Sequence, residues 1–297
     1  MIRSLSRQIA ALALLTASAA HAQPAGVGGP GSVLTRMDAT VSYTGAGEVE
    51  RKAGTGEAAT TLSSASAAVY YQASENLSLG TGAFWQGLWI DHNGSAPLPD
   101  HTHGLGLRLS GMWKPADAWS IRLDVRPGIY SDWQDIDGSD INFPALVAVG
   151  YQVNTNLLLV AGININPWSR LATIGGPGVW WRFAENWTLN LVLPKPTLEY
   201  SLTRNWITFI GGEITGGAFR VAEDFGNEYG RSNLNGEKFA YRELRASGGL
   251  RYRMGPFWGA SLEAGYAFNR QFEFREADWQ FRTDPAPFVR LGLQGAF

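Results

Sequence analysis

The 297-residue sequence contains no cysteine and only four histidines. Without cysteine the chain has neither disulfide bonds nor thiolate metal sites. Charged residues make up 17% of the chain, whereas roughly a quarter is usual in soluble domains. The formal net charge is −2, so no strong field attracts the protein to nucleic acid. These shortages exclude a disulfide-stabilised scaffold and argue against nucleic acid as a partner.

The sequence also lacks an apolar run long enough for a membrane-spanning helix, which needs about 20 residues. A shorter run, Ile9 to Leu15, follows Arg3 and Arg7 and precedes the tripeptide Ala-His-Ala at residues 20–22. A positive start, a short apolar core and an A-x-A site are typical of a cleaved signal peptide. We therefore predict a signal peptide over residues 1–22, a flexible periplasmic tail over 23–34 and a single domain over 35–297.

Glycine and aromatic residues are plentiful, with 36 Gly, 14 Phe, 12 Trp and 10 Tyr. Six segments each place an aromatic residue before a few polar turn residues and a run of alternating polarity. This pattern is typical of a β-hairpin with a tight turn. The six segments are YYQASENLSLG, MWKPADAWSIRL, YQVNTNLLLVAG, WRFAENWTLNL, YSLTRNWITFIGG and YRMGPFWGASLEAG.

The alternation assigns the side chains of each strand to two faces. In SIRLDVR, for example, Ile121 and Leu123 alternate with Arg122 and Asp124. A soluble β-sandwich and a membrane barrel share this pattern. The runs are about ten residues long, which is what a tilted strand needs to cross a bilayer. Short turns alternate with long polar loops, and tryptophans lie near both ends of the strands (Trp119, Trp187, Trp206 and Trp258 at the turns; Trp89, Trp133, Trp168 and Trp279 near the loops). Aromatic girdles of this kind favour an all-β, closed antiparallel transmembrane β-barrel.

The hairpins give twelve strands, and one strand before them and one after them bring the count to fourteen. Pro194 and Pro196 cannot donate hydrogen bonds to a ladder, so the count falls to twelve if the strands around them are not separate. A closed barrel pairs its last strand with its first. We expect the segment PFVRLGLQGAF to close the wall with its apolar side chains facing lipid: Val289, Leu291, Leu293 and Phe297. Its terminal Phe also resembles the signal that the barrel-assembly machinery reads in Gram-negative outer-membrane proteins.

Three segments resemble an uncharacterised family of Gram-negative outer-membrane β-barrels, a domain of unknown function. They are ENWTLNLVLPKPTLEYSLTRNW, RELRASGGLRYR and EAGYAFNRQFEFR, and the most specific piece is the L-P-K-P-x-L-x-Y run from Leu193 to Tyr200. The resemblance extends from about Tyr70 to Phe297. It implies a barrel in the outer membrane and implies neither a substrate nor catalytic residues.

The polar face of the strands carries charges of both signs. The predicted lumen-lining residues are Arg108, Arg122, Asp124, Arg126, Arg182, Glu199, Glu213, Glu243, Arg245, Arg251, Glu263 and Arg290, and the alternation places Glu273 on the same face. Rings of one sign would select ions, but here the signs nearly balance. Two interpretations stay open: a salt-bridged interior that braces the wall, and a narrow polar channel.

Two loops carry residues that bind metal ions in other proteins. His92, His101 and His103 fall in the predicted loop DHNGSAPLPDHTH, and four aspartates fall in DWQDIDGSD. Spacing alone is weak support for a site, and the acidic run lacks the closing Glu of an EF-hand. Ser95 lies near His92, but in a loop rather than on a strand, so we expect no enzyme activity. We assign no cofactor, metal or catalytic residue.

The sequence therefore predicts an outer-membrane barrel that acts as a passive pore or small-solute transporter with a mixed-charge lumen. A structural or surface-interaction barrel with a closed lumen is the alternative, and a lipid-modifying enzyme is the third reading. The expected surroundings are outer-membrane lipid and lipopolysaccharide, a small solute is the candidate ligand, and no nucleic acid is expected.

Overall fold

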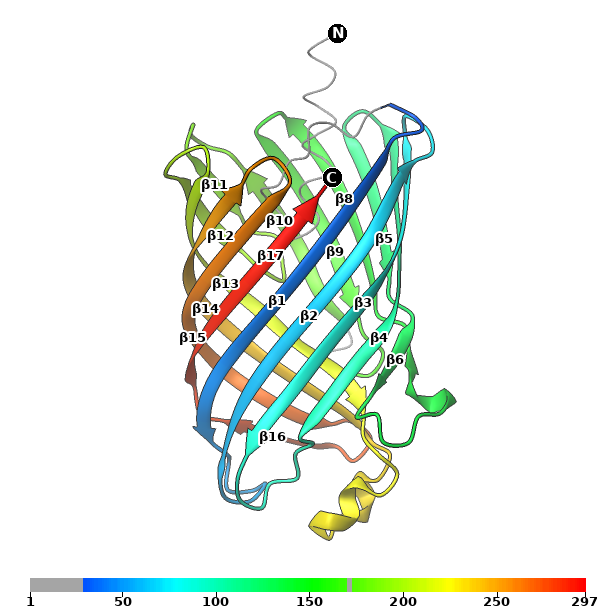
Figure 1. The fold of residues 1–297 in the computed structure, drawn as a ribbon, viewed down its shortest axis with the longest axis vertical. Coiled ribbons are helices and arrows are strands. Elements are labelled where there is room, and N and C mark those ends of the chain that lie inside the picture. Colours follow the sequence, from blue (N-terminus) through cyan, green and yellow to red (C-terminus); the bar gives the residue numbers. More distant parts are fainter. Residues whose placement is uncertain (1–28, 170–172) are drawn as a thin grey trace.

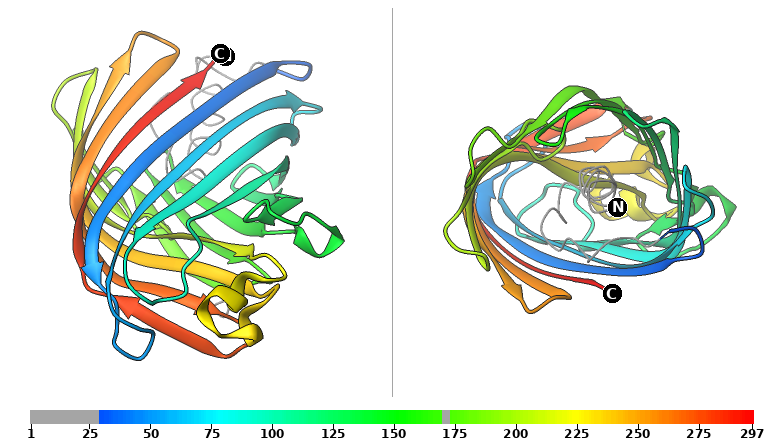
Figure 2. Two further views of the ribbon diagram at one scale, coloured as in Figure 1. Left: turned by 60° about the horizontal axis from the view of Figure 1, so that its bottom comes forward. Right: turned by 90° about the horizontal axis from the view of Figure 1, so that it is seen from above.

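The computed structural model describes residues 29–169 and 173–297, which form one sheet that closes on itself. Figure 1 shows strands that cross the molecule at a steep tilt, and the end-on view in Figure 2 shows a closed ring. The predicted closed antiparallel barrel is confirmed. Within the described residues, no helix has both the length and the apolar character needed to cross a membrane. The predicted signal peptide and the first half of the predicted tail, residues 23–28, lie outside the described residues.

The sheet has 17 strand segments, which make up fourteen wall strands. Three wall strands are each divided into two segments: β5 with β6, β7 with β8, and β16 with β17. The segments are β1 (Val33–Glu48), β2 (Glu57–Gln72), β3 (Leu77–His92), β4 (His101–Ala116), β5 (Trp119–Val125), β6 (Gly128–Ser131), β7 (Ile141–Asn142), β8 (Ala145–Asn154), β9 (Leu157–Ile165), β10 (Thr173–Trp181), β11 (Trp187–Asn190), β12 (Thr197–Ser201), β13 (Trp206–Arg220), β14 (Lys238–Met254), β15 (Trp258–Phe274), β16 (Trp279–Thr283) and β17 (Ala286–Ala296). The first strand begins two residues before the predicted start of the barrel.

Strand β17 lies between β15 and β1, and its pairing with β1 closes the ring. Leu291 is opposite Val41 of β1 and opposite Leu262 of β15. The side chains predicted to face lipid on this strand are all exposed: Val289 44%, Leu291 55%, Leu293 45% and Phe297 46%. The last residue is held as well, since Phe297 and Thr35 exchange two backbone hydrogen bonds.

The two faces of the wall differ as alternation requires. Leu123 is 48% exposed while its neighbours Arg122 and Asp124 are 7% and 2% exposed. Large apolar side chains face outward on most of the strands, and such a surface is stable only against lipid or another apolar partner. The outer surface is therefore the lipid-facing side of a transmembrane barrel.

The two ends of the barrel differ, and we name them the turn end and the loop end. The turn end carries the C-terminus and the six short turns that the hairpin segments predicted (Figure 1). Trp119, Trp187, Trp206 and Trp258 are 38–46% exposed there and form an interfacial belt. The loop end carries the long loops and three 3-10 turns: η1 (Gly138–Asp140), η2 (Phe225–Tyr229) and η3 (Ser232–Leu234).

The proline-rich segment is a tight hairpin that joins two separate short strands. β11 and β12 pair in register from Trp187 with Tyr200 to Asn190 with Thr197. Of the two strand counts, fourteen is correct. This hairpin is much shorter than its neighbours, because β13 has 15 residues whereas β12 has five.

A bulge in β15 reverses which side chains point inward. The register between β14 and β15 shifts by one residue between Arg242 and Leu244, and Asn269 has a positive φ of 46°. A one-residue shift moves every later side chain to the opposite face. Arg270 and Phe272 therefore point inward, and the predicted inward position of Glu273 is wrong.

Candidate functional site

The interior of the loop end is filled by aromatic side chains. We call this group the loop-end cluster: Phe84, Tyr130, Trp168, Phe219, Phe239, Tyr241, Phe272, Phe274 and Phe281, each at most 7% exposed. The rings lie close together, with centroids of Tyr241 and Phe272 at 4.8 Å and of Phe272 and Phe281 at 5.4 Å. Contacts of this kind stabilise a packed core beyond the area that they bury. The loop end therefore has a dry core inside the barrel.

The loop-end cluster joins opposite walls of the barrel. Tyr130 of β6 contacts Phe84 of β3 at 5.8 Å between centroids and Phe219 of β13 at 6.4 Å. The backbone also bridges the two sides, because Arg220 of β13 pairs in parallel with Ser131 of β6. The Asp132 carboxylate accepts a 2.7 Å hydrogen bond from the backbone N–H of Ala222, and burial raises the pKa of Asp132. These contacts close the mouth at the loop end.

The cluster corrects one part of the predicted aromatic girdles. Trp168 is only 7% exposed and lies inside the cluster, and Trp279 packs against it. The other two loop-end tryptophans stay on the outer face: Trp133 is 40% exposed, and Trp89 is half-buried and alternates with the inward Leu88. The predicted girdle at the loop end is therefore confirmed at two tryptophans, whereas Trp168 and Trp279 belong to the packed interior.

A group of four charged side chains lies in the middle of the barrel, and we call it the Lys195 cluster. Lys195 sits at the tip of the β11–β12 hairpin, where its ammonium contacts Glu263 of β15 at 2.6 Å and Glu213 of β13 at 3.7 Å. Arg290 of β17 contacts the same two carboxylates at 3.5 and 2.5 Å. Two positive and two negative charges balance. The cluster ties the short hairpin to the far strands.

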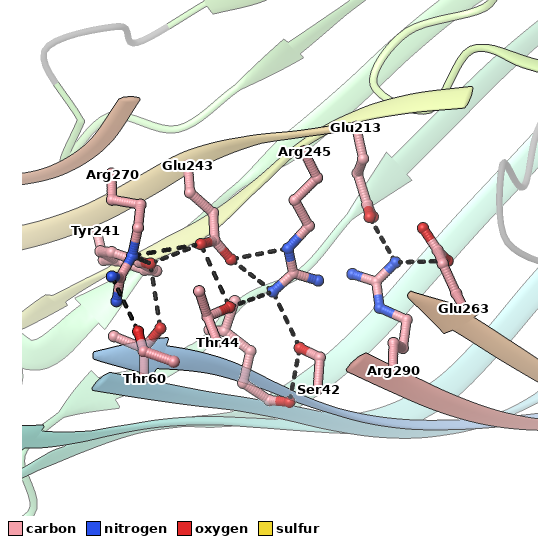
Figure 3. Close-up of polar contacts among 12 residues, drawn as sticks. Ser42, Thr44, Thr60, Glu213, Tyr241, Glu243, Arg245, Glu263, Arg270 and Arg290 are labelled. Atoms are coloured by element: carbon pink, nitrogen blue, oxygen red, sulfur yellow. Dashed lines mark hydrogen bonds and ion pairs between the residues drawn. The ribbon is translucent and has the colours of Figure 1, made fainter. Parts of the chain in front are cut away.

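A fully buried polar network around Glu243 lies beside the Lys195 cluster, as Figure 3 shows. Its carboxylate accepts hydrogen bonds from Arg245 at 2.8 and 2.5 Å and from the Tyr241 hydroxyl at 2.8 Å. Arg270 donates to the backbone carbonyl of Ala58 at 3.1 Å. The side chains of Glu243, Arg245 and Arg270 are all 0% exposed. Charges removed from water to this degree are stable only when they are paired and hydrogen-bonded.

The other predicted lumen residues fall into two further groups and one isolated position. Asp124 contacts Arg108 at 2.9 Å, Arg122 at 3.3 Å and Arg126 at 3.2 Å. Arg251 contacts Glu199 at 2.7 Å. Arg182 lies beyond the end of β10 in an exposed position, with its guanidinium 5.7 Å from the ring centre of Trp180.

Several interior residues escaped the sequence reasoning. Lys195 was missed because it lies in a turn, although prolines on both sides of a lysine are a signal for a rigidly placed side chain. Arg270 was missed because of the bulge at Asn269. The aromatic cluster had a visible signal: Phe239 and Tyr241 precede Glu243 in the same alternation.

A cavity of about 320 Å³ lies inside the wall between the loop-end cluster and the Lys195 cluster. Its apolar lining comes from β8, β9, β13 and the hairpin, and it includes Ala148, Val160, Val192 and Ile214. Polar side chains border it as well, among them Asn164, Asn166, Glu213, Thr215 and Arg242. A volume of this size is in the range of small-molecule sites, and so is a mostly apolar lining with a few polar groups.

The histidine and aspartate segments are arranged differently from the prediction. The strands extend further than expected, so His92 ends β3 and both His101 and His103 belong to β4 rather than to a loop. His92 contacts Asp100 at 3.3 Å, and the Ser95 hydroxyl accepts a hydrogen bond from the N–H of Thr55. Within residues 29–169 and 173–297, no three His, Asp or Glu side chains converge in a way that could hold a metal ion.

The acidic loop contacts β13, a strand distant from it in the sequence. Asp137 and Asp140 form a reciprocal cap on η1, and both carboxylates lie 3.7 Å from Arg220. These contacts fix the loop against the end of β13. The loop therefore forms part of the closure of the mouth.

Three solved structures are similar to the chain at low sequence identity. The COG4313 outer membrane channel from Pseudomonas putida F1 is 10% identical, with 90% of this chain and 96% of that chain covered and a TM-score of 0.46. The TodX deltaS2S3 mutant monoaromatic hydrocarbon channel is 8% identical, with 91% of both chains covered and a TM-score of 0.44. The translocator domain of the autotransporter NalP from Neisseria meningitidis is 13% identical, with 91% and 90% covered and a TM-score of 0.41.

No curated protein sequence matches the chain. One family model does, and its match covers residues 95–293. That range holds eleven of the fourteen wall strands in full or nearly so, together with the Lys195 cluster. It begins later than the predicted start at Tyr70. The chain belongs to the family described as Domain of unknown function (DUF6268).

Proposed function

We propose that the protein is an outer-membrane transport barrel for small solutes, with a mixed-charge interior and an outer mouth that is closed in this conformation. The turn end faces the periplasm, the loops face lipopolysaccharide, and a signal peptide directs export. The C-terminal Phe is the part read by the assembly machinery. The observation that carries the transport function is the cavity of about 320 Å³ beneath the loop-end cluster, since a purely structural barrel has no need of one.

A structural barrel with a closed lumen is the second candidate, and the loop-end cluster favours it. Both candidates place balanced charges inside. The two candidates differ in what happens when the loop-end cluster is removed. A transport barrel has a conduit beneath the cluster, so an ion path opens, whereas a structural barrel has no conduit.

Conductance in a planar bilayer tests the proposal. The refolded wild-type protein is expected to conduct weakly and with little ion selectivity, because its outer mouth is closed and its interior charges balance. Phe219→Ala removes a ring that joins opposite walls and is expected to raise the conductance clearly. Phe268→Ala is the matched control, because that ring faces outward at 42% exposure. If neither variant conducts while both remain folded, the structural candidate is correct.

A further inference from the structure

The wall of the barrel has a gap beside the short hairpin. β11 pairs with β10 only at Trp180 and Trp181, and the N–H of Leu191 adds one bond to the carbonyl of Val179 at 2.7 Å. On the other side, β13 pairs with β12 as far as Gly211, and the N–H groups of Gly212 and Ile214 add bonds to the carbonyls of Pro196 and Pro194 at 3.0 and 2.9 Å. Beyond these points, towards the loop end, β10 and β13 have no strand between them in the described part of the chain.

The edge of β10 is adapted to being unpaired. Backbone groups of alternate residues point the same way along a strand, so Gly175 and Pro177 present theirs to the same side as Val179. Proline has no N–H, so Pro177 removes one donor that would otherwise face the gap. Gly176 has a φ of +150° and so does Gly216 on β13, and this conformation is accessible essentially to glycine alone.

Both edges of the gap line the interior cavity. Gly175 and Gly176 of β10 border it on one side, and Thr215 and Gly216 of β13 border it on the other. Unpaired backbone in hydrocarbon costs several kcal/mol per group, and it is tolerated where it lines a cavity. The cavity therefore reaches the outer surface between β10 and β13.

The gap lies at the boundary of the lipid-facing surface. Leu244 and Phe268 are outward and 38% and 42% exposed. The next position on β14 is Arg242, which donates a 2.7 Å hydrogen bond to Gln271 and also borders the cavity. Apolar side chains give way to polar ones here, as they do where acyl chains meet headgroups.

Resting on the transport function proposed above, we propose that this gap admits small uncharged amphipathic molecules from the outer leaflet into the cavity. Ala148 and Val160 provide an apolar surface for the body of such a molecule. The amides of Asn164 and Asn166 offer hydrogen bonds to its polar end. Glu213 is already paired with Arg290 and Lys195, so the cavity offers no free carboxylate to a charged ligand. A medium-chain alcohol fits this description.

Cysteine labelling in lipid vesicles tests the proposal, because the natural chain has no cysteine. Three single variants of the full chain are compared. Thr215→Cys lies in the cavity at the gap, Ile210→Cys faces lipid on the same strand at 62% exposure, and Ser110→Cys lies inside under the fully paired part of the wall. Each is treated with a maleimide that dissolves in the bilayer, and labelling is read by mass.

We expect Thr215→Cys and Ile210→Cys to be labelled and Ser110→Cys to remain unlabelled. Adding 1-decanol to the vesicles is expected to abolish labelling at Thr215→Cys and to leave Ile210→Cys unchanged. Absence of labelling at Thr215→Cys in a folded variant would overturn the lateral opening. Labelling without protection by 1-decanol would mean that lipid chains fill the gap, and protection by decanoate alone would mean that the ligand is anionic; either result overturns the ligand assignment.

The outcome is separable from that of the transport function. Suppose that Thr215→Cys is labelled and 1-decanol protects it, while neither the wild-type protein nor Phe219→Ala conducts ions. This result supports the lateral site and refutes the axial conduit. Conductance without labelling at Thr215→Cys supports the conduit and refutes the lateral site.

Discussion

Replacing Glu243 by Gln would test whether the interior is dry or hydrated. The carboxylate balances Arg245 at 2.5 Å and lies 3.9 Å from Arg270, and all three side chains are 0% exposed. Gln keeps the shape and one acceptor oxygen but removes the negative charge. Two guanidinium groups are then left in a site that excludes water.

The magnitude follows from the burial. Removing one partner of a buried ion pair costs about 3–5 kcal/mol, and the lower end applies here because Gln still accepts a hydrogen bond. A pair in a hydrated lumen would contribute only about 0–1 kcal/mol. The two descriptions of the interior therefore predict clearly different losses.

The free energy of unfolding can be measured by urea titration in lipid vesicles, with tryptophan fluorescence and the migration of unheated samples on gels as the two readouts. Glu276→Gln is the matched control, because its pair with Lys238 at 2.5 Å is exposed (61% and 30%). The control is expected to lose less than about 1 kcal/mol. Equal losses in both variants would refute the reasoning and indicate that water reaches Glu243.

Two further predictions concern the wall. Deleting residues 292–297 removes backbone pairs with both β1 and β15. The truncated chain should fail to assemble, because unpaired backbone in lipid costs several kcal/mol per group. Normal amounts of heat-modifiable protein in the membrane fraction would contradict this prediction. Leu123→Arg, on the lipid face, should cost about 2–4 kcal/mol in a urea titration, whereas Leu202→Arg, in a short turn at 52% exposure, should cost about 0–1 kcal/mol. If the two arginines cost the same, the lipid-facing band has been placed wrongly.

The closed mouth and the gap together suggest how the proposed transport would work. The loop-end cluster fills the interior at the loop end, and in our proposal the cavity beneath it opens to the surface between β10 and β13. A molecule that dissolves in the outer leaflet would reach the cavity without crossing the cluster. The contact between Lys195 and Glu263 holds the tip of the β11–β12 hairpin in the middle of the barrel, away from the proposed opening.

Much of the fold follows from the sequence because it depends on local rules. A period of two assigns faces, so Leu123 and Arg122 could be placed on opposite sides of the wall without a structure. Turn residues mark each hairpin, and the number of hairpins gives the number of strands. The final strand must close the ring, because an open edge in lipid is too costly.

The functional features were decided by contacts between residues far apart in the chain. Lys195 meets Glu263, 68 positions away, and nothing in the LPKP run specifies that partner. One bulge at Asn269 turned Arg270 inward, since a single extra residue reverses all later faces. The closure of the mouth and the gap beside the hairpin arise where strands of unequal length meet across the ring. Alternation reports only which face a side chain occupies, whereas depth, pairing and gaps depend on how the whole ring closes.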